Sequence, residues 1–410
     1  MPEGEIDQSP PRDPSRRRVA VVTGTRAEFG LLRPVMFAVH ARPDLELCVI
    51  AAGSHLVLPA ESFRDVKRDF AIADSVPMQL AGRTTRADDA EALGRGVSRF
   101  TRSFVHLVPD WVVVLGDRIE AFAAAAAASV GGWSLAHIHG GDRAEGVADE
   151  AMRHAITKLA HVHFAATPMS CERIIGMGEK PETVHVVGSP AIDDLAAMPP
   201  LDDAEFEALG SPSIVVLLHP LGREVAFEER VASAVLAATA GVTGHERVLI
   251  LQPNLDPGRE GVMRAIAAHT REHGEKEGPG IQVRSHLPRA AFVGLLRRLA
   301  LADGEQGAEG GVLIGNSSAG LIECAAIGVP VVDIGPRQSG RERCKNVVHA
   351  SETTESVATA IRQARMLRPS LARGMMQHPY GDGTTGVRIA RILSEIDPHD
   401  PLLRRKRCTY

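Results

Sequence analysis

One pattern repeats through most of the chain: a short apolar run, a turn rich in glycine or polar residues, and then a segment with helical apolar periodicity. The apolar runs predict buried strands and the periodic segments predict helices. Strands that alternate with helices form a parallel, doubly wound sheet. Two series of this kind predict an α/β protein with two Rossmann-like domains. The expected strands are 18–22, 45–52, 111–115, 135–138, 162–166 and 184–187, and then 214–218, 247–252, 282–284, 312–314 and 331–334.

A proline- and acid-rich stretch at 193–212 separates the two series. With 410 residues the chain is also too long for one ordinary core, so we expect a domain boundary there. Residues 1–18 are polar and proline-rich, which predicts a disordered tail. A last helix is expected at about 386–396. Residues 399–410 form a second tail, whose basic run we expect to be solvated and frayed.

The composition argues against several classes of partner. A net charge of −5 without a basic stripe, and an aromatic content of only 4%, disfavour nucleic acid. No apolar run reaches membrane-spanning length and no signal peptide opens the chain, so we expect no membrane partner and a cytoplasmic location. The five cysteines are scattered without a CxxC pair. The His-x-His pairs at 137/139 and 161/163 have no third ligand of convincing spacing, so no metal is predicted.

The turn at 315–323 (GNSSAGLIE) is the most specific functional signal. It lies between an apolar strand and a predicted helix, where backbone N–H groups and the positive end of a helix dipole can bind phosphate. Glu323, inside that helix, can accept both hydroxyls of a ribose. Phosphate and ribose sites side by side indicate a nucleotide. The alternative is an ordinary strand-to-helix turn with serine as the N-cap.

Charged side chains also gather at the carboxyl ends of the other predicted strands, where such sheets bind their ligands. Each has a structural alternative. Asp117 can cap the next helix, with Glu120 completing a capping box. His139, which is followed by two glycines, is either a working imidazole or a buried, satisfied one. Asp149 and Glu150 suit the start of a helix without any chemistry.

Further candidates follow other strands. His219 comes after the first strand of the second series and can take or give a proton near neutral pH. Arg337 and Arg341 come after the strand that follows the nucleotide-like turn, and they are candidates to clamp a diphosphate. Arg26 belongs to a Gly-Thr-Arg turn that resembles half a phosphate cradle, although a tight turn with a solvated arginine is equally common.

Together these motifs resemble the UDP-N-acetylglucosamine 2-epimerases, and most of all the hydrolysing branch of that family. The resemblance runs in order from about residue 19 to residue 396. The matching stretches are 22–28 (VTGTRAE), 114–118 (VLGDR), 137–142 (HIHGGD), 149–159 (DEAMRHAITKL), 315–323 (GNSSAGLIE), 335–341 (GPRQSGR) and 379–383 (PYGDG).

The resemblance implies a glycosyltransferase-B architecture, in which two Rossmann-like domains face each other across the active-site cleft. It assigns residues 19–192 plus 383–398 to the N-terminal domain, with a C-terminal helix that crosses back to it, and residues 193–382 to the nucleotide-binding domain. Members of the family eliminate UDP from the sugar to give a 2-acetamidoglucal, and the hydrolysing branch then adds water. Dimers are common among them, so we expect a homodimer.

Functional residues can be carried over by position. His139 stands where many relatives have glutamate, and Asp142 where glutamate is frequent, so the group that takes the proton from sugar carbon 2 stays open. The acid–base positions are occupied by Asp117, His139, Asp149, Glu150 and His219. The substrate-binding candidates are Arg26, Arg118, His286, Ser317, Ser318, Glu323 and Arg337.

We therefore predict hydrolytic 2-epimerisation of a UDP-linked 2-acetamido sugar, such as UDP-N-acetylglucosamine to N-acetylmannosamine plus UDP, without a cofactor. The alternatives are a non-hydrolysing UDP-sugar 2-epimerase, a glycosyltransferase of the same architecture, and a silent nucleotide-sugar-binding protein. The sequence specifies neither the sugar nor the nucleobase.

Overall fold

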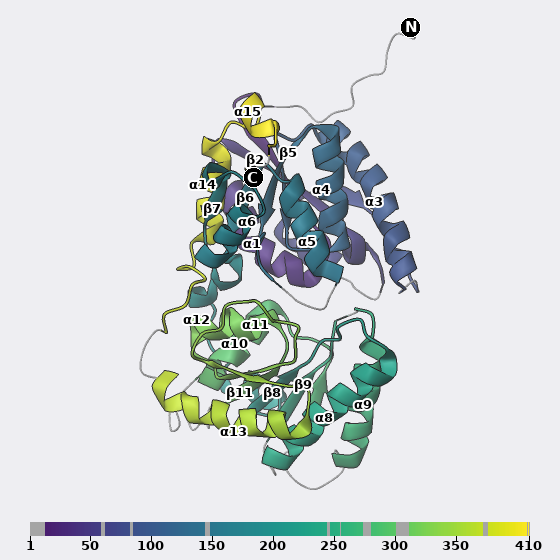
Figure 1. Ribbon diagram of the computed structural model, residues 1–410, viewed down its shortest axis with the longest axis vertical. Coiled ribbons are helices and arrows are strands. Elements are labelled where there is room, and N and C mark those ends of the chain that lie inside the picture. The colour runs from purple at the N-terminus through teal and green to yellow at the C-terminus, as the bar shows by residue number, and fades with distance from the viewer. Residues whose placement is uncertain are drawn as a thin grey trace. The chain divides into compact units, whose positions relative to one another are not determined.

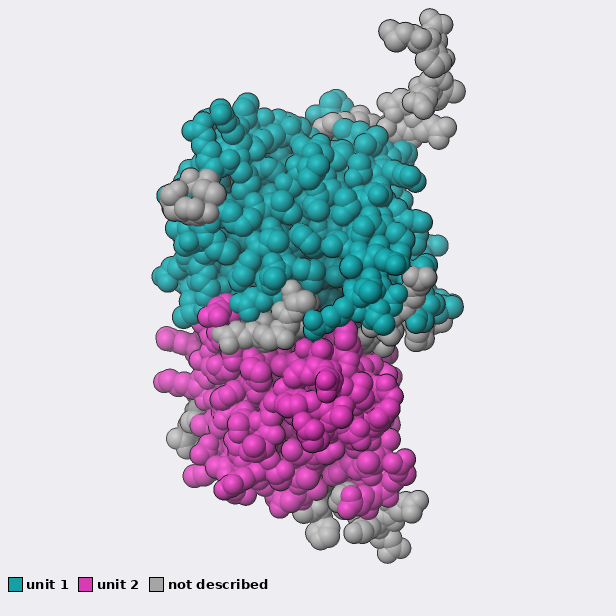
Figure 2. Space-filling view, turned by 45° about the vertical axis from the view of Figure 1, so that its right-hand side comes forward, with its two compact units in different colours: residues 1–142, 148–193, 381–410 teal, residues 143–147, 194–380 magenta. Residues whose placement is uncertain are grey.

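The computed structural model describes residues 13–58, 62–82, 85–143, 148–243, 247–254, 256–273, 280–300, 311–371, 376–407 and 409. The chain divides into two compact units (Figure 2). Unit 1 consists of Met1–Asp142, Ala148–Asp193 and Gly381–Tyr410. Unit 2 consists of Arg143–Val147 and Asp194–Tyr380.

The described residues of unit 1 form a parallel sheet with the strand order β3-β2-β1-β4-β5-β6-β7. Successive residues of β1 point to opposite faces, and both faces are buried, as expected for a parallel sheet between helices. The strands are β1 (Arg17–Thr23), β2 (Leu45–Ala52), β3 (Ile72–Val76), β4 (Trp111–Leu115), β5 (Ser134–Ile138), β6 (Val162–Ala165) and β7 (Val184–Val186).

Helices cover both faces of this sheet (Figure 1). The helices α1 and α14 pack over one face and α3, α4 and α5 over the other. At the crossing of α14 with α1, a Cβ on Gly386 would lie 2.7 Å from the Pro34 carbonyl oxygen, so the close approach requires glycine. The helices are α1 (Arg26–His40), α2 (Phe63–Asp69), α3 (Arg86–Leu107), α4 (Ile119–Gly131), α5 (Ala148–Leu159), α6 (Pro168–Gly176), α14 (Thr385–Glu395) and α15 (Pro401–Arg404).

Residues 401–407 do not form the frayed tail that the sequence predicts, although Arg404, Arg405 and Arg407 are exposed as expected. Residues Pro401–Arg404 form α15, and the Lys406 ammonium lies 2.7 Å from a carboxylate oxygen of Glu179. The same ammonium donates to the carbonyls of Thr157 and Ala160 at the end of α5. A basic residue is attractive at that helix end, because unpaired carbonyls gather there.

Unit 2 contains a second parallel sheet with the order β10-β9-β8-β11-β12-β13. Its strands are β8 (Ile214–Leu217), β9 (Val248–Leu251), β10 (Ile281–Arg284), β11 (Val312–Gly315), β12 (Val331–Ile334) and β13 (Val347–Ala350). Its helices are α7 (Asp203–Ala208), α8 (Val225–Thr243), α9 (Arg259–His273), α10 (Arg289–Ala300), α11 (Ser318–Leu321), α12 (Glu323–Ile327) and α13 (Thr354–Leu371).

The predicted α/β class with two parallel sheets is confirmed. Two strands were not predicted, β3 and β13, and each lies at the edge of its sheet. Edge strands are covered less completely than central ones, and both carry polar or partly exposed residues that interrupt the apolar run. Among the described residues, we find no helix with the length and apolarity needed to cross a membrane.

Candidate functional site

Each sheet has one point at which its strand order reverses, and parallel sheets bind ligands beyond the carboxyl ends of the strands at that point. In unit 1 the reversal lies between β1 and β4, and in unit 2 between β8 and β11. The residues that follow these strands are therefore the first to be considered. After β1 and β4 come Arg26 and Asp117, and after β8 and β11 come His219 and Ser317.

Asp117 forms an ion pair rather than a helix cap. Its carboxylate contacts the guanidinium of Arg153 from α5, and the other terminal nitrogen of Arg153 donates to the His139 carbonyl at 3.2 Å. The helix α4 begins at Ile119 with Arg118 at the N-cap and no side-chain cap, so the predicted capping box is wrong. Arg153 is buried, whereas Asp117 keeps 16% of its side-chain surface exposed, so the carboxylate is paired with a cation and still accessible.

Two acids of this unit, Glu28 and Glu120, form a buried pair that the sequence did not predict. Glu28 and Glu120 are 4% and 0% exposed. Glu28 Oε2 accepts a 2.7 Å hydrogen bond from the Gly24 amide, and the carboxyl of Glu120 interacts with the backbone amides of Glu120 itself and of Ser54. Burial, reinforced by repulsion from Glu120, raises the pKa of Glu28 to about 8, and burial also raises the pKa of Glu120.

Two glycines make room for the acid pair, and they are the signal from which it could have been found. A Cβ on Gly24 would lie 2.6 Å from Glu120 Cβ, and one on Gly53 would lie 2.2 Å from Glu120 Oε1. Gly53 also has φ +55, a conformation that side chains with a Cβ rarely adopt. The glycines that follow β1 and β2 therefore leave room for the side chain of Glu120, which enters from the first turn of α4.

His139 is fully engaged through both ring nitrogens. Its Nδ1 lies 2.8 Å from Asp142 Oδ2 and its Nε2 lies 3.0 Å from the Ser189 hydroxyl. Asp142 in turn accepts a 2.8 Å hydrogen bond from the hydroxyl of Ser170. Because a carboxylate only accepts, Nδ1 donates to Asp142, and Nε2 is hydrogen-bonded to the Ser189 hydroxyl. The backbone of His139 is left-handed, with φ 63.

Three further candidates of unit 1 belong to the first turns of α1 and α5. Arg26 lies in the first turn of α1, 3.6 Å from an Asp65 carboxylate oxygen, with 41% of its side-chain surface exposed. Glu150 lies 3.5 Å from the His154 ring within α5. Asp149 belongs to the first turn of the same helix, but its side chain lies outside the described part of the structure.

The nucleotide-like turn of unit 2 differs from the single helix predicted for it. Ser317 caps α11 by accepting a hydrogen bond from the Ala319 amide, and Ser318 is the first residue of that helix. The helix breaks at Ile322, so Glu323 begins a separate helix, α12. Glu323 is buried, and its Oε1 lies 3.3 Å from the Arg289 guanidinium of α10.

Three candidates in unit 2 can be placed around Asn316. The Asn316 side chain bonds to the main chain of His219, and the Asn316 carbonyl accepts a 3.1 Å hydrogen bond from Arg337. Ser317 is the next residue along the chain. His286, by contrast, is exposed after β10 and has the Ser285 hydroxyl 3.5 Å from its Nδ1.

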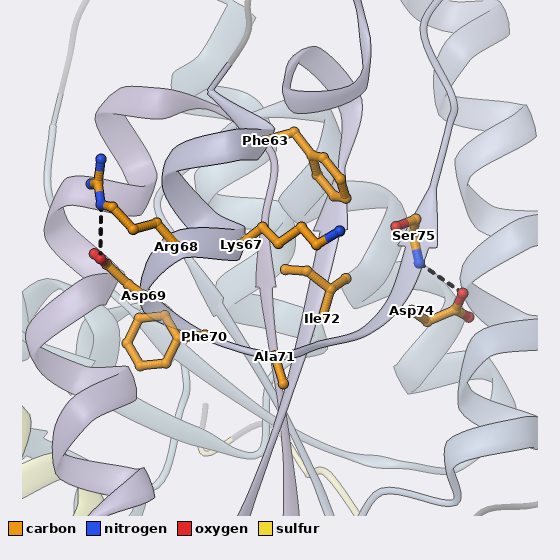
Figure 3. A pocket seen from close by; sticks show the side chains of 9 residues that line it. All are labelled: Phe63, Lys67, Arg68, Asp69, Phe70, Ala71, Ile72, Asp74 and Ser75. Carbon is orange, nitrogen blue, oxygen red and sulfur yellow. Dashed lines mark hydrogen bonds and ion pairs between the residues drawn. The ribbon is translucent and has the colours of Figure 1, made fainter.

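One cavity of about 700 Å³ lies in unit 1 between α2 and β3 (Figure 3). Lys67 and Asp69 bring charge to its lining, and Phe63 and Ile72 bring apolar surface. None of the candidate residues lines it. Within the described residues, no three histidine, cysteine, aspartate or glutamate side chains are grouped as metal ligands.

Comparison with known proteins agrees with the fold and the motifs. A family model described as UDP-N-acetylglucosamine 2-epimerase matches residues 37–394. The chain is 34% identical to the UDP-N,N'-diacetylbacillosamine 2-epimerase (hydrolyzing) of Legionella pneumophila, over 95% of this chain and 98% of that protein. It is 30% identical to a UDP-N-acetylglucosamine 2-epimerase of Neisseria meningitidis, over 85% and 87% of the two chains.

Solved structures show the same fold at lower identity. The UDP-GlcNAc 2-epimerase from Neisseria meningitidis bound to UDP-GlcNAc superposes with a TM-score of 0.75 at 17% identity, covering 92% of this chain and 99% of that one. The Methanocaldococcus jannaschii enzyme in complex with UDP-GlcNAc and UDP gives a TM-score of 0.74 at 16% identity, with the same coverage. The chain therefore belongs to the UDP-N-acetylglucosamine 2-epimerase family.

Proposed function

We propose that this protein is a hydrolysing 2-epimerase that converts a UDP-linked 2-acetamido sugar into the free 2-epimer and UDP. The observation that carries the proposal is the 34% identity, over nearly the full length, to the hydrolyzing diacetylbacillosamine enzyme of Legionella pneumophila. A Campylobacter jejuni relative, 27% identical over 82% of this chain, is also a hydrolyzing diacetylbacillosamine epimerase. A UDP-linked diacetamido sugar is therefore the first substrate to test, and UDP-N-acetylglucosamine, which would yield N-acetylmannosamine, is the second.

The reaction sets the requirements for the site. A base takes the proton from sugar carbon 2, the electron pair of that bond forms the double bond between carbons 1 and 2, and the bond from carbon 1 to the UDP oxygen breaks. Water then adds across the double bond and gives the free sugar. A proton of low acidity needs a positioned base, and the charge that develops on UDP needs donors and cations.

We assign the acid–base work to unit 1. The carboxylate of Asp117 is the first candidate for the base, because its ion pair with Arg153 fixes it beyond the end of β4 while 16% of its side-chain surface stays exposed. Asp149 and Glu150, at the start of α5, are candidates to handle the water. His139 is held by Asp142 and Ser189 on both nitrogens, so it acts on the substrate either through its Ser189 partner or after release from it.

We assign the nucleotide to unit 2, with the diphosphate at the turn after β11. Ser317 and Ser318 offer hydroxyls and the start of a helix, and Arg337 brings positive charge to the same turn. Glu323 is proposed to accept the ribose hydroxyls and His286 to contact the nucleotide. Arg26 and Arg118, in unit 1, are further candidates for binding the substrate.

The test is a panel of nucleotide sugars incubated with the protein in heavy water and followed by proton NMR. We expect free UDP and a free 2-epimeric sugar that carries deuterium at carbon 2. A UDP-sugar equilibrium without free UDP would instead establish the non-hydrolysing epimerase. A glycoside without deuterium at carbon 2 would establish a glycosyltransferase.

Asp117→Asn tests the proposed base. It should abolish glucal formation while leaving UDP binding nearly intact. Asp69→Asn is the control, since it also weakens an Asp–Arg pair of unit 1, with Arg33 at 2.6 Å, but at none of the candidate residues. Full turnover by the Asp117→Asn protein would count against the assignment.

The proposal includes a homodimer in the cytoplasm. Cys48, Cys171, Cys324 and Cys344 are free thiols, which suits a reducing compartment. Size-exclusion chromatography with light scattering measures the oligomeric state. A monomeric mass would contradict the proposed dimer.

A further inference from the structure

The side chain of Asn316 clamps the main chain of His219. Asn316 follows β11 and His219 follows the neighbouring strand β8, at the point where the strand order of unit 2 reverses. The amide of His219 donates to Asn316 Oδ1 at 2.8 Å, and Asn316 Nδ2 donates to the His219 carbonyl at 2.8 Å. These reciprocal bonds satisfy both backbone groups of His219 with one side chain, so its position is coupled to that of Asn316.

Asn316 is itself fixed. It is 2% exposed, and its carbonyl accepts hydrogen bonds from Arg337 at 3.1 Å and from Gln338 at 2.9 Å. The preceding residue, Gly315, has φ +153, and a Cβ there would lie 1.9 Å from the Leu217 carbonyl oxygen. The chain thus reaches Asn316 through a conformation and a close approach that require glycine.

The imidazole of His219 is held in one tautomer. The Asn254 amide donates to His219 Nδ1 at 3.3 Å. A backbone N–H can only donate, so Nδ1 must accept and carries no proton. In the neutral ring the proton then lies on Nε2.

We propose that Asn316 is a positioning residue for His219, and that His219 works as the neutral Nε2–H tautomer, donating a hydrogen bond to an oxygen of the departing diphosphate. The proposal deepens the function proposed above and rests on it. Loss of its remaining proton would turn the neutral ring into an imidazolate, so His219 contributes a hydrogen bond and not a proton. Such a donor stabilises the charge that develops as the bond from carbon 1 to oxygen breaks.

This assignment takes His219 out of the competition for the carbon 2 proton. A ring whose Nδ1 already accepts from a backbone amide, and whose Nε2 carries a proton, has no free lone pair to receive another proton. The base must then come from the candidates of unit 1, with Asp117 first. In this assignment a carboxylate removes the proton from carbon 2, and the imidazole of His219 stabilises the departing diphosphate.

The tautomer can be measured without any substrate. Full-length protein labelled with ¹⁵N-histidine is recorded by long-range ¹H–¹⁵N correlation at neutral pH, and a His219→Gln sample identifies the signal of His219. We expect an unprotonated Nδ1 and a protonated Nε2 in the wild type. We expect Asn316→Ala to lose the single tautomer. A protonated Nδ1 in the wild type would overturn the proposal, even if the enzyme turns over.

Asn346→Ala is the matched control. Asn346 is also a buried asparagine of unit 2, 0% exposed, whose Nδ2 donates to the Val329 carbonyl at 2.9 Å. It should lose comparable stability and keep both the His219 tautomer and kcat. Asn316→Ala should lower kcat by about tenfold to a hundredfold while KM changes little. Asn316→Asp, which can still accept from the His219 amide but cannot donate to its carbonyl, should fall between them.

Equal losses of kcat in Asn316→Ala and Asn346→Ala would show a merely structural role for Asn316 and overturn the proposal. If no nucleotide sugar is turned over, the proposed function fails, whereas the NMR result still decides the tautomer and the clamp. The two failures are therefore distinguishable.

Discussion

The buried carboxyl of Glu28 should make the folded protein less stable as the pH rises. Burial, with repulsion from Glu120, raises the pKa of Glu28 from its ordinary value of 4.5 to about 8. Between these two pH values the folded protein keeps a proton that the unfolded chain has already lost. Stability falls with pH wherever the folded state binds more protons than the unfolded state. The contribution is therefore complete below pH 4.5 and is lost as the pH rises through about 8.

The size of the effect follows from the same pKa values. One pKa unit corresponds to about 1.4 kcal/mol, so the whole change amounts to about 5 kcal/mol. The experiment covers pH 5 to pH 7.5. Over that range Glu28 should lower the free energy of unfolding by about 3 kcal/mol. That is a large fraction of the stability of an ordinary domain, at about 5–15 kcal/mol.

Glu28→Gln isolates this contribution. Glutamine keeps an oxygen that can accept from the Gly24 amide in place of Glu28 Oε2, but it cannot ionise. Compared with the wild type, the variant should gain about 3 kcal/mol of unfolding free energy from pH 5 to pH 7.5. Histidines that are buried in their neutral form, such as His137, titrate in both proteins and cancel in the difference.

Urea unfolding followed by tryptophan fluorescence measures the difference. Trp111 and Trp133 are the only tryptophans of the chain, and both belong to unit 1, as Glu28 does. Glu182→Gln, at an exposed position of unit 1, is the control and should give a curve parallel to the wild type. A Glu28→Gln curve that is also parallel to the wild type would refute the reasoning, since it would mean that Glu28 is ionised in the folded protein.

Three further predictions concern the glycine turn, the ribose and the His139 network. Gly53→Ala should destabilise the protein by about 2 kcal/mol or more, because its Cβ would meet Glu120 at 2.2 Å, and an unchanged melting temperature would contradict this. Glu323→Ala should weaken UDP binding about tenfold by calorimetry, through loss of charged hydrogen bonds; an unchanged Kd would refute the ribose role. Asp142→Asn should lower kcat by about tenfold or more, because an amide can donate to Nδ1 and reverse the His139 tautomer. Wild-type kcat in that variant would show that the tautomer of His139 is irrelevant to turnover.

The sequence by itself determined the class of the fold, and the comparisons confirm the family that its motifs resemble. Apolar runs, glycine turns and helical periodicity are local patterns, so central strands such as β4 and β11 could be predicted from a few neighbouring residues. The edge strands β3 and β13 were not predicted. They are not buried along their whole length, so their sequences lack a continuous apolar run. The same local reasoning placed the candidate residues at the ends of the strands.

Only the tertiary structure decided what those residues contact. Asp117 meets Arg153 from the next strand connection, Asn316 reaches back to His219, and Lys406 returns from the end of the chain to Glu179. The sequence left helix capping open as one of two interpretations for Asp117 and predicted a solvated tail, because those are the commonest local uses of such residues. Partners that are distant along the chain are brought together by strand order, and a single sequence carries no local trace of that order.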